Sequence, residues 1–397
     1  MATKTLLLDS GKEWGGGTNS MFELLKRIDR SRFEVSAVFY HNYPRGSDTD
    51  LLHELTAIGI PLQILPPLRQ PLWAKLAKEL ARGFLGWHRP WRQQAVFAIE
   101  MAWRIRPNAQ RLAAILKHGG YQLLYMNNQP SSNLEGYLAA EMAGVPAVQH
   151  CRIDATLNPL EISLANRVGR RIICVSHGVA ESLRSQGIAP DKCTVVSNAI
   201  DGTQALPPPA SLPAGATGRL VIGTVSSLTA RKSVDHLLRA AAPLIVTNVL
   251  PLHLLIVGDG PQRRALERLA ADLGLNEHIT FAGFQKNALP WIAATDVFVL
   301  ASAKEGLPRV ILEAMLLGKP VVSSRVVGSK ELVVENETGL MYEYGDLTAL
   351  AECLRALTHD AKKRSGMGAA GRTRVLAEYS IGHYVAAVQK ELEHAVA

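Results

Sequence analysis

The sequence lacks the cysteine pairs that mark disulfide-stabilised or zinc-binding domains. Its four cysteines, Cys151, Cys174, Cys193 and Cys353, lie far apart in a chain of 397 residues, and no two of them form a C-x-x-C pair. This spacing favours the reduced, mostly buried thiols of a cytosolic protein over a disulfide framework or a zinc site.

Long apolar runs are also absent. No run approaches the ~18 apolar residues of a membrane span. The start, MATKTLLLDSGKEWGGG, has only three adjacent leucines, too few for a signal peptide. We therefore expect a cytoplasmic protein. The 47% apolar fraction is that of an ordinary soluble protein, and 397 residues exceed the usual size of one core, which predicts two domains.

Acidic residues are scarce in one segment. Residues 68–118 hold ten lysines and arginines against Glu79 and Glu100, so this segment alone matches the net charge of +8 of the whole chain. It also contains four of the six tryptophans. Such a pattern suits contact with anionic lipid headgroups, here at the inner face of the membrane. A pair of solvated helices with aromatic inner faces explains it equally well. We expect no nucleic-acid partner, because no binding motif accompanies the charge.

Short apolar strands followed by helical segments recur along the chain, which predicts a parallel α/β fold. The expected strands are 4–9, 33–40, 121–127, 146–150 and 171–176 in the first half, and 220–226, 253–260, 279–284, 297–302 and 320–324 in the second half. The two halves would form Rossmann-like βαβ domains that face each other across a cleft. Ligands of such sheets bind at the carboxyl ends of the strands.

A stretch rich in proline, glycine and alanine, PPPASLPAGATG, separates the two halves and has the composition of a linker. We therefore place the first domain at 1–206, the linker at 207–218 and the second domain at 219–375. A C-terminal helix at 376–397 is expected to pack back on the first domain.

Glycine loops follow a strand and precede a helix in both halves. In GGG at 15–17, glycines let backbone N–H groups approach an anion at the start of a helix, although a tight turn also explains them. GDGP at 258–261 has the same arrangement in the second half. The segment TARKSVD places Arg231 and Lys232 directly after a strand, where two cations can neutralise a diphosphate.

Two glutamates lie eight positions apart in KEGLPRVILEAMLLGKPVVSS, residues 304–324. Pro308 fixes φ where a helix begins, so Glu305 lies in the preceding loop and Glu313 lies just over one turn into the helix. The first N–H groups of that helix lack intrahelical partners and can hold a phosphate. Each carboxylate can accept hydrogen bonds from vicinal hydroxyls. Two such acceptors beside an anion site match a nucleotide sugar, with its ribose, diphosphate and sugar.

Two other functions fit these glutamates less well. A metal site would need more oxygen ligands at a fixed distance. A glycosidase would need the pair to flank one bond, with one carboxyl group kept protonated, and nothing obvious in the sequence would raise either pKa. We therefore expect the pair to hold a nucleotide sugar as a substrate, with no metal and no cofactor.

Together these segments resemble the retaining glycosyltransferases with the glycosyltransferase-B fold and the E-x7-E signature, described as glycosyl transferases group 1. The resemblance spans nearly the whole chain and is strongest from 171 to 345. Its motifs follow in the order and spacing of that family: CVSHGVAESLRSQGI, VVSNAID, TVSSLTARKSVDHLLRA, LLIVGDGP, ITFAGF, VFVLASAKEGLPRVILEAMLLGKPVVSS and GSKELVVENETGLMY.

The resemblance implies roles for the residues of the second domain. Glu313 would bind the ribose and Glu305 the hydroxyls of the donor sugar. Lys232 would bind the diphosphate, helped by the backbone amides of Gly306 and Leu307.

Further roles concern the loops at the carboxyl ends of strands. Gly16 and Gly17 match the glycine loop that approaches the donor phosphate and the acceptor, and Gly258 and Asp259 join the nucleotide-sugar site. His150, at the end of a strand in PAVQHC, matches the histidine near the donor sugar. A histidine in such a place is otherwise more often structural than catalytic.

One departure from the family concerns the diphosphate. The family usually has arginine in a GRL segment where this chain has Ser226-Ser227-Leu228. Lys232 is retained, and Arg231 beside it can supply the missing charge.

The resemblance thus implies a retaining, metal-independent glycosyltransferase. It would move a sugar from a nucleotide-diphosphate sugar to a glycan or lipid-linked acceptor in bacterial lipopolysaccharide, envelope polysaccharide or glycolipid synthesis, with the acceptor on the first domain. Two alternatives stay open: a nucleotide-sugar epimerase of the same fold, and a non-catalytic protein that binds sugar nucleotides.

Overall fold

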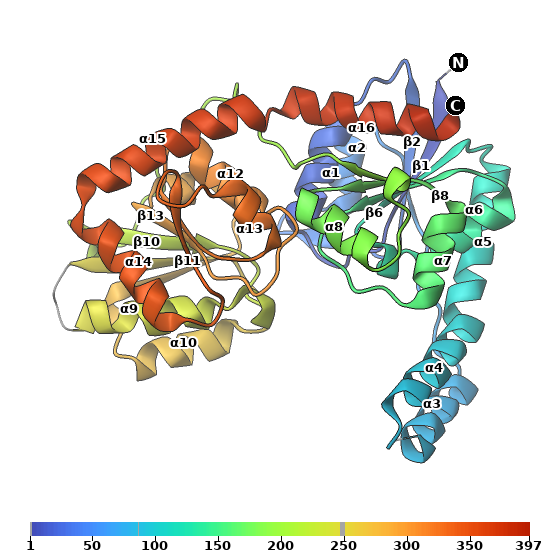
Figure 1. Ribbon diagram of the computed structural model, residues 1–397, viewed down its shortest axis with the longest axis horizontal. Coiled ribbons are helices and arrows are strands. Elements are labelled where there is room, and N and C mark those ends of the chain that lie inside the picture. Colours follow the sequence, from blue (N-terminus) through green and yellow to red (C-terminus); the bar gives the residue numbers. More distant parts are fainter. Residues whose placement is uncertain (1, 86, 247–250) are drawn as a thin grey trace.

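The first part of the chain is built on a seven-stranded sheet in which all paired strands are parallel (Figure 1). The structure is a computed structural model that describes residues 2–85, 87–246 and 251–397. The strand order is β5-β2-β1-β6-β7-β8-β9, with the bounds β1 (Thr3–Asp9), β2 (Phe33–Phe39), β5 (Leu62–Ile64), β6 (Leu123–Asn127), β7 (Ala147–Cys151), β8 (Gly169–Cys174) and β9 (Cys193–Val195).

Helices cover both faces of this sheet, because successive strand residues point to opposite sides. In β1, Leu6 and Leu8 pack in the cluster that includes α5 and α6, whereas Leu7 packs on the other face with α1 and α16. The helices that cover this sheet are α1 (Gly16–Arg27), α2 (Leu51–Ala57), α5 (Arg106–His118), α6 (Leu134–Ala143), α7 (Pro159–Val168) and α8 (His177–Ser185).

The second part repeats this design with a six-stranded parallel sheet. Its order is β12-β11-β10-β13-β14-β15, with the bounds β10 (Leu220–Val225), β11 (Leu252–Val257), β12 (Ile279–Gly283), β13 (Val297–Leu300), β14 (Val321–Ser324) and β15 (Gly339–Tyr342). Its helices are α9 (Val234–Val246), α10 (Arg263–Asp272), α11 (Leu289–Ala293), α12 (Arg309–Leu316), α13 (Val327–Leu332), α14 (Leu347–His359) and α15 (Ala361–Glu378). The predicted fold, two Rossmann-like α/β domains, is confirmed.

The chain crosses twice between the two sheets. Residues 207–213 have no regular secondary structure and lead into β10. The second crossing follows α15, where Ile200 accepts a backbone hydrogen bond from Ile381 (3.1 Å) and donates one to Tyr379 (2.9 Å). The last helix, α16 (Ile381–Val396), then lies across the first sheet (Figure 1). Its Val388 and Leu392 are buried in the core of that domain.

A helical hairpin projects from the first domain, away from the rest of the molecule (Figure 1). It consists of α3 (Leu72–Phe84) and α4 (Arg89–Glu100), and α4 continues through a π-helical turn at Met101–Ile105 into α5. We call α3 and α4 the arm. Among the described helices, none is long and apolar enough to cross a membrane.

Candidate active site between the two domains

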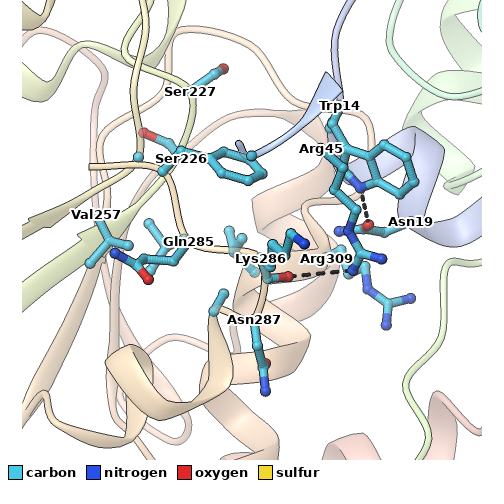
Figure 2. Close-up of a pocket in the computed structure, with 18 of the residues that line it drawn as sticks. Trp14, Asn19, Arg45, Ser226, Ser227, Val257, Gln285, Lys286, Asn287 and Arg309 are labelled. Carbon is cyan, nitrogen blue, oxygen red and sulfur yellow. Dashed lines mark hydrogen bonds between the residues drawn. The ribbon is translucent and has the colours of Figure 1, made fainter. Parts of the chain in front are cut away.

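A cavity of about 1040 Å³ lies between the two sheets, at the carboxyl ends of strands from both (Figure 2). The first domain lines it with the loop after β1, the start of α1 and a two-stranded ribbon, β3 (Pro44–Arg45) and β4 (Thr49–Asp50). The second domain contributes the loops after β10, β11 and β12 and the start of α12. This is where open α/β sheets bind their ligands.

Four residues predicted for the site line the cavity: Gly16, Gly258, Asp259 and Glu313. Gly16 is the first residue of α1, so the glycine loop begins the helix itself. A Cβ at Gly16 would meet nothing within 4 Å, which leaves its backbone open to a ligand.

Gly258 is required for a different reason. Its φ is +130°, which side chains rarely tolerate, and a Cβ there would lie 1.8 Å from the carbonyl oxygen of Ser226. The glycine therefore allows the loops after β10 and β11 to touch, and this contact shapes one wall of the cavity.

Glu313 is almost completely buried and is held by a cation on its own helix. The Nε of Arg309 lies 3.0 Å from its Oε1, and Nη1 of Arg309 donates to the backbone oxygen of Ala199 in the first domain at 3.2 Å. Burial raises the pKa of Glu313; Arg309 opposes this shift and the nearby Glu23 adds to it. The pair is one turn apart, at the i,i+4 spacing at which helical side chains meet.

Glu305 does not line the cavity and is engaged by two cations. Lys232 Nζ lies 2.5 Å and Arg231 Nη1 3.5 Å from its Oε1. Burial disfavours the carboxylate, but the charges of Lys232 and Arg231 outweigh it, so the pKa of Glu305 lies below its ordinary value. The structure thus joins three predicted site residues in one ion cluster around the buried Glu305, outside the lining of the cavity.

Gly306 and Leu307 lie at the contact between the domains. A Cβ at Gly306 would come within 2.2 Å of the backbone oxygen of Arg152, and Leu307 accepts a hydrogen bond from Asn198 Nδ2 at 2.7 Å. Gly17 packs against the Arg152 side chain, since a Cβ at Gly17 would be 3.8 Å from the Cγ of Arg152. Glycine at 306 lets the loop before α12 press directly on the first domain.

His150 is buried at the end of β7, and it does not line the cavity. Its Nδ1 lies 2.7 Å from the hydroxyl oxygen of Tyr125, and among the described residues its Nε2 has no partner. Burial, with a smaller effect of Arg152, lowers the pKa of His150 well below its ordinary value, so the ring is neutral. Its catalytic role stays a prediction.

Sequence reasoning missed several cavity residues. Trp14 donates from Nε1 to Asn19 Oδ1 at 2.7 Å, and the guanidinium of Arg45 lies over its ring, 4.7 Å from the centroid. Figure 2 shows these residues opposite Ser226 and Ser227 of the second domain. Only Trp14 had a signal in the sequence, its place directly before the glycine loop; Arg45 comes from a ribbon that no pattern predicted.

Polar contacts hold the two domains together around the cavity. Glu331 accepts hydrogen bonds from the backbone N–H groups of His177 (2.9 Å) and Gly178 (2.7 Å) at the start of α8. The Nζ of Lys304, the residue before Glu305, lies 3.1 Å from Oδ2 of Asp154 in the first domain. These contacts hold the two domains against each other.

Two family models match the chain. The model described as Glycosyltransferase Family 4 matches residues 14–204, and the one described as Glycosyl transferases group 1 matches residues 219–360. The two matches cover the two sheets separately.

Curated relatives match parts of the chain. Lipopolysaccharide core biosynthesis glycosyltransferase LpsE of Rhizobium meliloti (strain 1021) is 32% identical over 217 residues, which are 53% of this chain and 60% of that protein. The Escherichia coli UDP-Gal:alpha-D-GlcNAc-diphosphoundecaprenol alpha-1,3-galactosyltransferase is 27% identical over 273 residues, 63% of this chain and 69% of that protein. The chain thus spans about three fifths of LpsE.

Solved structures are similar over almost the entire chain. Anabaena Alr3699/HepE in complex with UDP-glucose has a TM-score of 0.76 at 22% identity, covering 98% of this chain and 99% of that one. A glycosyltransferase from Rickettsia africae ESF-5 has a TM-score of 0.74 at 17% identity, with 100% and 99% covered. At these identities the likeness shows the fold. The chain therefore has the glycosyltransferase-B fold, with a first domain that matches Glycosyltransferase Family 4 and a second domain that matches Glycosyl transferases group 1.

Proposed function

We propose that the protein transfers a sugar from a nucleoside-diphosphate sugar to an acceptor hydroxyl, with retention of the anomeric configuration, in the synthesis of a bacterial envelope glycan or glycolipid. The observation that carries this proposal is the cavity of about 1040 Å³, which has room for a nucleotide sugar and is lined by Glu313 and Arg309. Curated relatives with matching domains are named glycosyltransferases, which favours transfer over epimerisation.

The nucleotide would lie in the second-domain half of the cavity. Glu313 would accept hydrogen bonds from the ribose hydroxyls, which replace the bond that it now accepts from Arg309. The freed guanidinium would then turn to the diphosphate, near Ser226 and Ser227. Arg309 would thereby supply the cation that other members of the family have at the position of Ser227. A guanidinium suits this role because it binds phosphate with two parallel hydrogen bonds.

Glu305, Lys232 and Arg231 lie outside the lining of the cavity, and we propose that donor binding brings this ion cluster to the sugar end of the donor. Glu305 would orient the sugar hydroxyls, while Lys232 and Arg231 neutralise the leaving diphosphate together with the backbone amides of Gly306 and Leu307. Such fixed charges stabilise the negative charge that develops on the leaving group and need no reorganisation during the reaction. We propose that these groups, without a divalent metal or a cofactor, supply that stabilisation.

The chemical step would take place on one face of the sugar. The bond from the anomeric carbon to the diphosphate oxygen breaks, the acceptor oxygen bonds to the same carbon from the same side, and its proton passes to the leaving phosphate. His150 is neutral and would orient the sugar or the acceptor without acting as a nucleophile. Closure of the domains would keep water out and limit hydrolysis.

The acceptor would be a lipid-linked glycan or glycolipid bound on the first domain. The names of two relatives include acceptors of this kind, phosphatidylinositol monomannoside and a diphosphoundecaprenol-linked sugar. The two names share a sugar on a lipid carrier, which supports this class of acceptor and leaves the linkage open.

The test has two stages. A thermal-shift screen with UDP-, GDP- and ADP-sugars should identify one donor, and that donor should release its nucleoside diphosphate only with an acceptor present. The product should keep the anomeric configuration of the donor by NMR, and EDTA should not stop turnover. Conversion of the sugar nucleotide without acceptor would instead mean an epimerase. Donor binding without turnover on a broad acceptor panel would mean a binding protein.

A further inference from the structure

The arm exposes an unusual amount of apolar surface for a hairpin that stands away from the core. Seven large apolar side chains lie on it and on the turn between its two helices, and Leu72, Phe84 and Trp87 are 79%, 75% and 86% exposed. The full set is Leu72, Trp73, Leu76, Leu80, Phe84, Trp87 and Trp91. Four of them recur every fourth residue along α3, so they lie on one face of that helix. This face is therefore a continuous apolar stripe that nothing in the described chain covers.

The inner side of the arm is fixed in place. Lys78 forms an ion pair with Glu100 of α4, and its Nζ lies 5.3 Å from the centroid of the Trp103 ring. Ala74 is the buried residue of α3. Because the inner contacts hold the hairpin closed, the outer stripe cannot turn inward without breaking them.

Within residues 68–118, the exposed large apolar side chains are confined to the arm and the turn between its two helices. In α5, which continues from α4, Leu112 and Leu116 are completely buried in the core of the first domain. The sequence pattern over 68–118 therefore divides into two parts, an arm with a free apolar face and a helix that belongs to the core. The alternative explanation, an aromatic inner face, applies to Trp103, since α5 itself holds no phenylalanine, tyrosine or tryptophan.

Cations accompany the apolar stripe. Lys75 is exposed and Arg92 is half-buried, and neither has an acidic partner within the described residues. Arg82 is exposed and pairs with Glu79, the one acidic residue of α3. Gly86 and the side chain of Arg89 lie outside the described part. The surface thus combines large apolar groups with an excess of positive charge.

We propose that the arm docks on the surface of an anionic lipid membrane, with its apolar stripe among the headgroups and its cations facing the phosphates. Tryptophan and basic residues on a helical element are the combination that partitions into this interface. A second copy of the chain fits less well, because two identical arms would bring like charges together. Docking would hold the first domain beside its acceptor; that consequence alone rests on the proposed function, since it needs the acceptor to be lipid-linked.

The test is vesicle flotation of the full-length protein without any substrate. The wild type should float with vesicles of phosphatidylethanolamine and phosphatidylglycerol, and at least about tenfold less with phosphatidylcholine alone. The triple variant Leu76→Ser, Leu80→Ser, Phe84→Ser should lose flotation, and Lys75→Glu with Arg92→Glu should weaken it on anionic vesicles. Leu76, Leu80, Phe84 and Lys75 are exposed and Arg92 is half-buried without an acidic partner in the described part, so the variants should melt like the wild type.

A matched control separates this surface from general stickiness. Leu52→Ser with Val396→Ser removes exposed apolar side chains away from the arm, each 40% exposed, and should float like the wild type. Flotation of the triple variant equal to that of the wild type would overturn the proposal. The proposal would also be overturned if the wild type did not float and instead formed a dimer, seen by light scattering, that the triple variant does not form. Donor binding by thermal shift is read separately, so failure of the proposed activity leaves this result intact.

Discussion

The Lys232–Glu305 ion pair allows structural and catalytic roles to be separated by a double-mutant cycle. Lys232→Met leaves the buried carboxylate with only Arg231, whose Nη1 is 3.5 Å from Oε1. Breaking a buried pair costs ~3–5 kcal/mol. Since one cation remains, we expect a loss of about 3 kcal/mol in the free energy of unfolding. Glu305→Gln keeps an acceptor for Lys232 and should cost about 2 kcal/mol, as for one charge-assisted hydrogen bond.

The double variant Lys232→Met, Glu305→Gln should be no less stable than the less stable single variant. Lys232→Met alone leaves a poorly paired buried carboxylate, and the second substitution removes that carboxylate. Urea unfolding followed by circular dichroism should therefore give a coupling free energy of about 2 kcal/mol or more. Transfer activity should fall by about 100-fold or more in all three variants, as when one preorganised donor is removed. A coupling near zero, or a double variant with restored activity, would refute the reasoning.

The remaining predictions concern the cavity and its two carboxylates. Arg309→Gln should weaken binding of the donor's nucleoside diphosphate about tenfold, as for one lost hydrogen bond to a charged group, and leave the free nucleoside unaffected by calorimetry; equal losses for both would contradict the phosphate role. Gly258→Ala should lower the melting temperature, because its Cβ meets a backbone oxygen at 1.8 Å, whereas Gly16→Ala should melt like the wild type and weaken only donor binding. Glu313 has a raised pKa, so the stability that it adds over Glu313→Gln should be present at low pH and decline as the pH rises from about 4.5 through its folded pKa. Glu305 has a lowered pKa, so its advantage over Glu305→Gln should be lost as the pH falls below about 4.5; melting curves with the same pH trend for both would contradict these assignments.

The fold was predictable because its strands are short apolar runs that recur with helices between them. A parallel strand that is buried on both faces appears in the sequence as a nearly continuous apolar run, as in LVIGTV of β10. The strands β5 and β9 have three residues each, which is too short for a run to stand out. The ribbon of β3 and β4 has two residues in each strand, so the residues that it brings to the cavity, such as Arg45, could not be foreseen.

The candidate site was predictable as far as a local pattern marks each of its parts, such as the glycine loops that hold Gly16 and Gly258. The i,i+4 spacing of Arg309 and Glu313 is visible in the sequence, and their pairing follows from helix geometry. The contact of Gly306 with Arg152 joins positions far apart in the chain and depends on how the two domains meet. No local pattern encodes that arrangement. The sequence therefore predicts a phosphate beside Gly306 but not the backbone of Arg152.

A crystal structure with the bound nucleoside-diphosphate sugar would test the central claim most directly. The account predicts the nucleotide in the cavity between the domains, with the ribose hydroxyls on Glu313 and the diphosphate between Arg309, Lys232 and the start of α12. A nucleotide bound outside this cavity, or one inside it that leaves the Arg309–Glu313 pair intact, would contradict it.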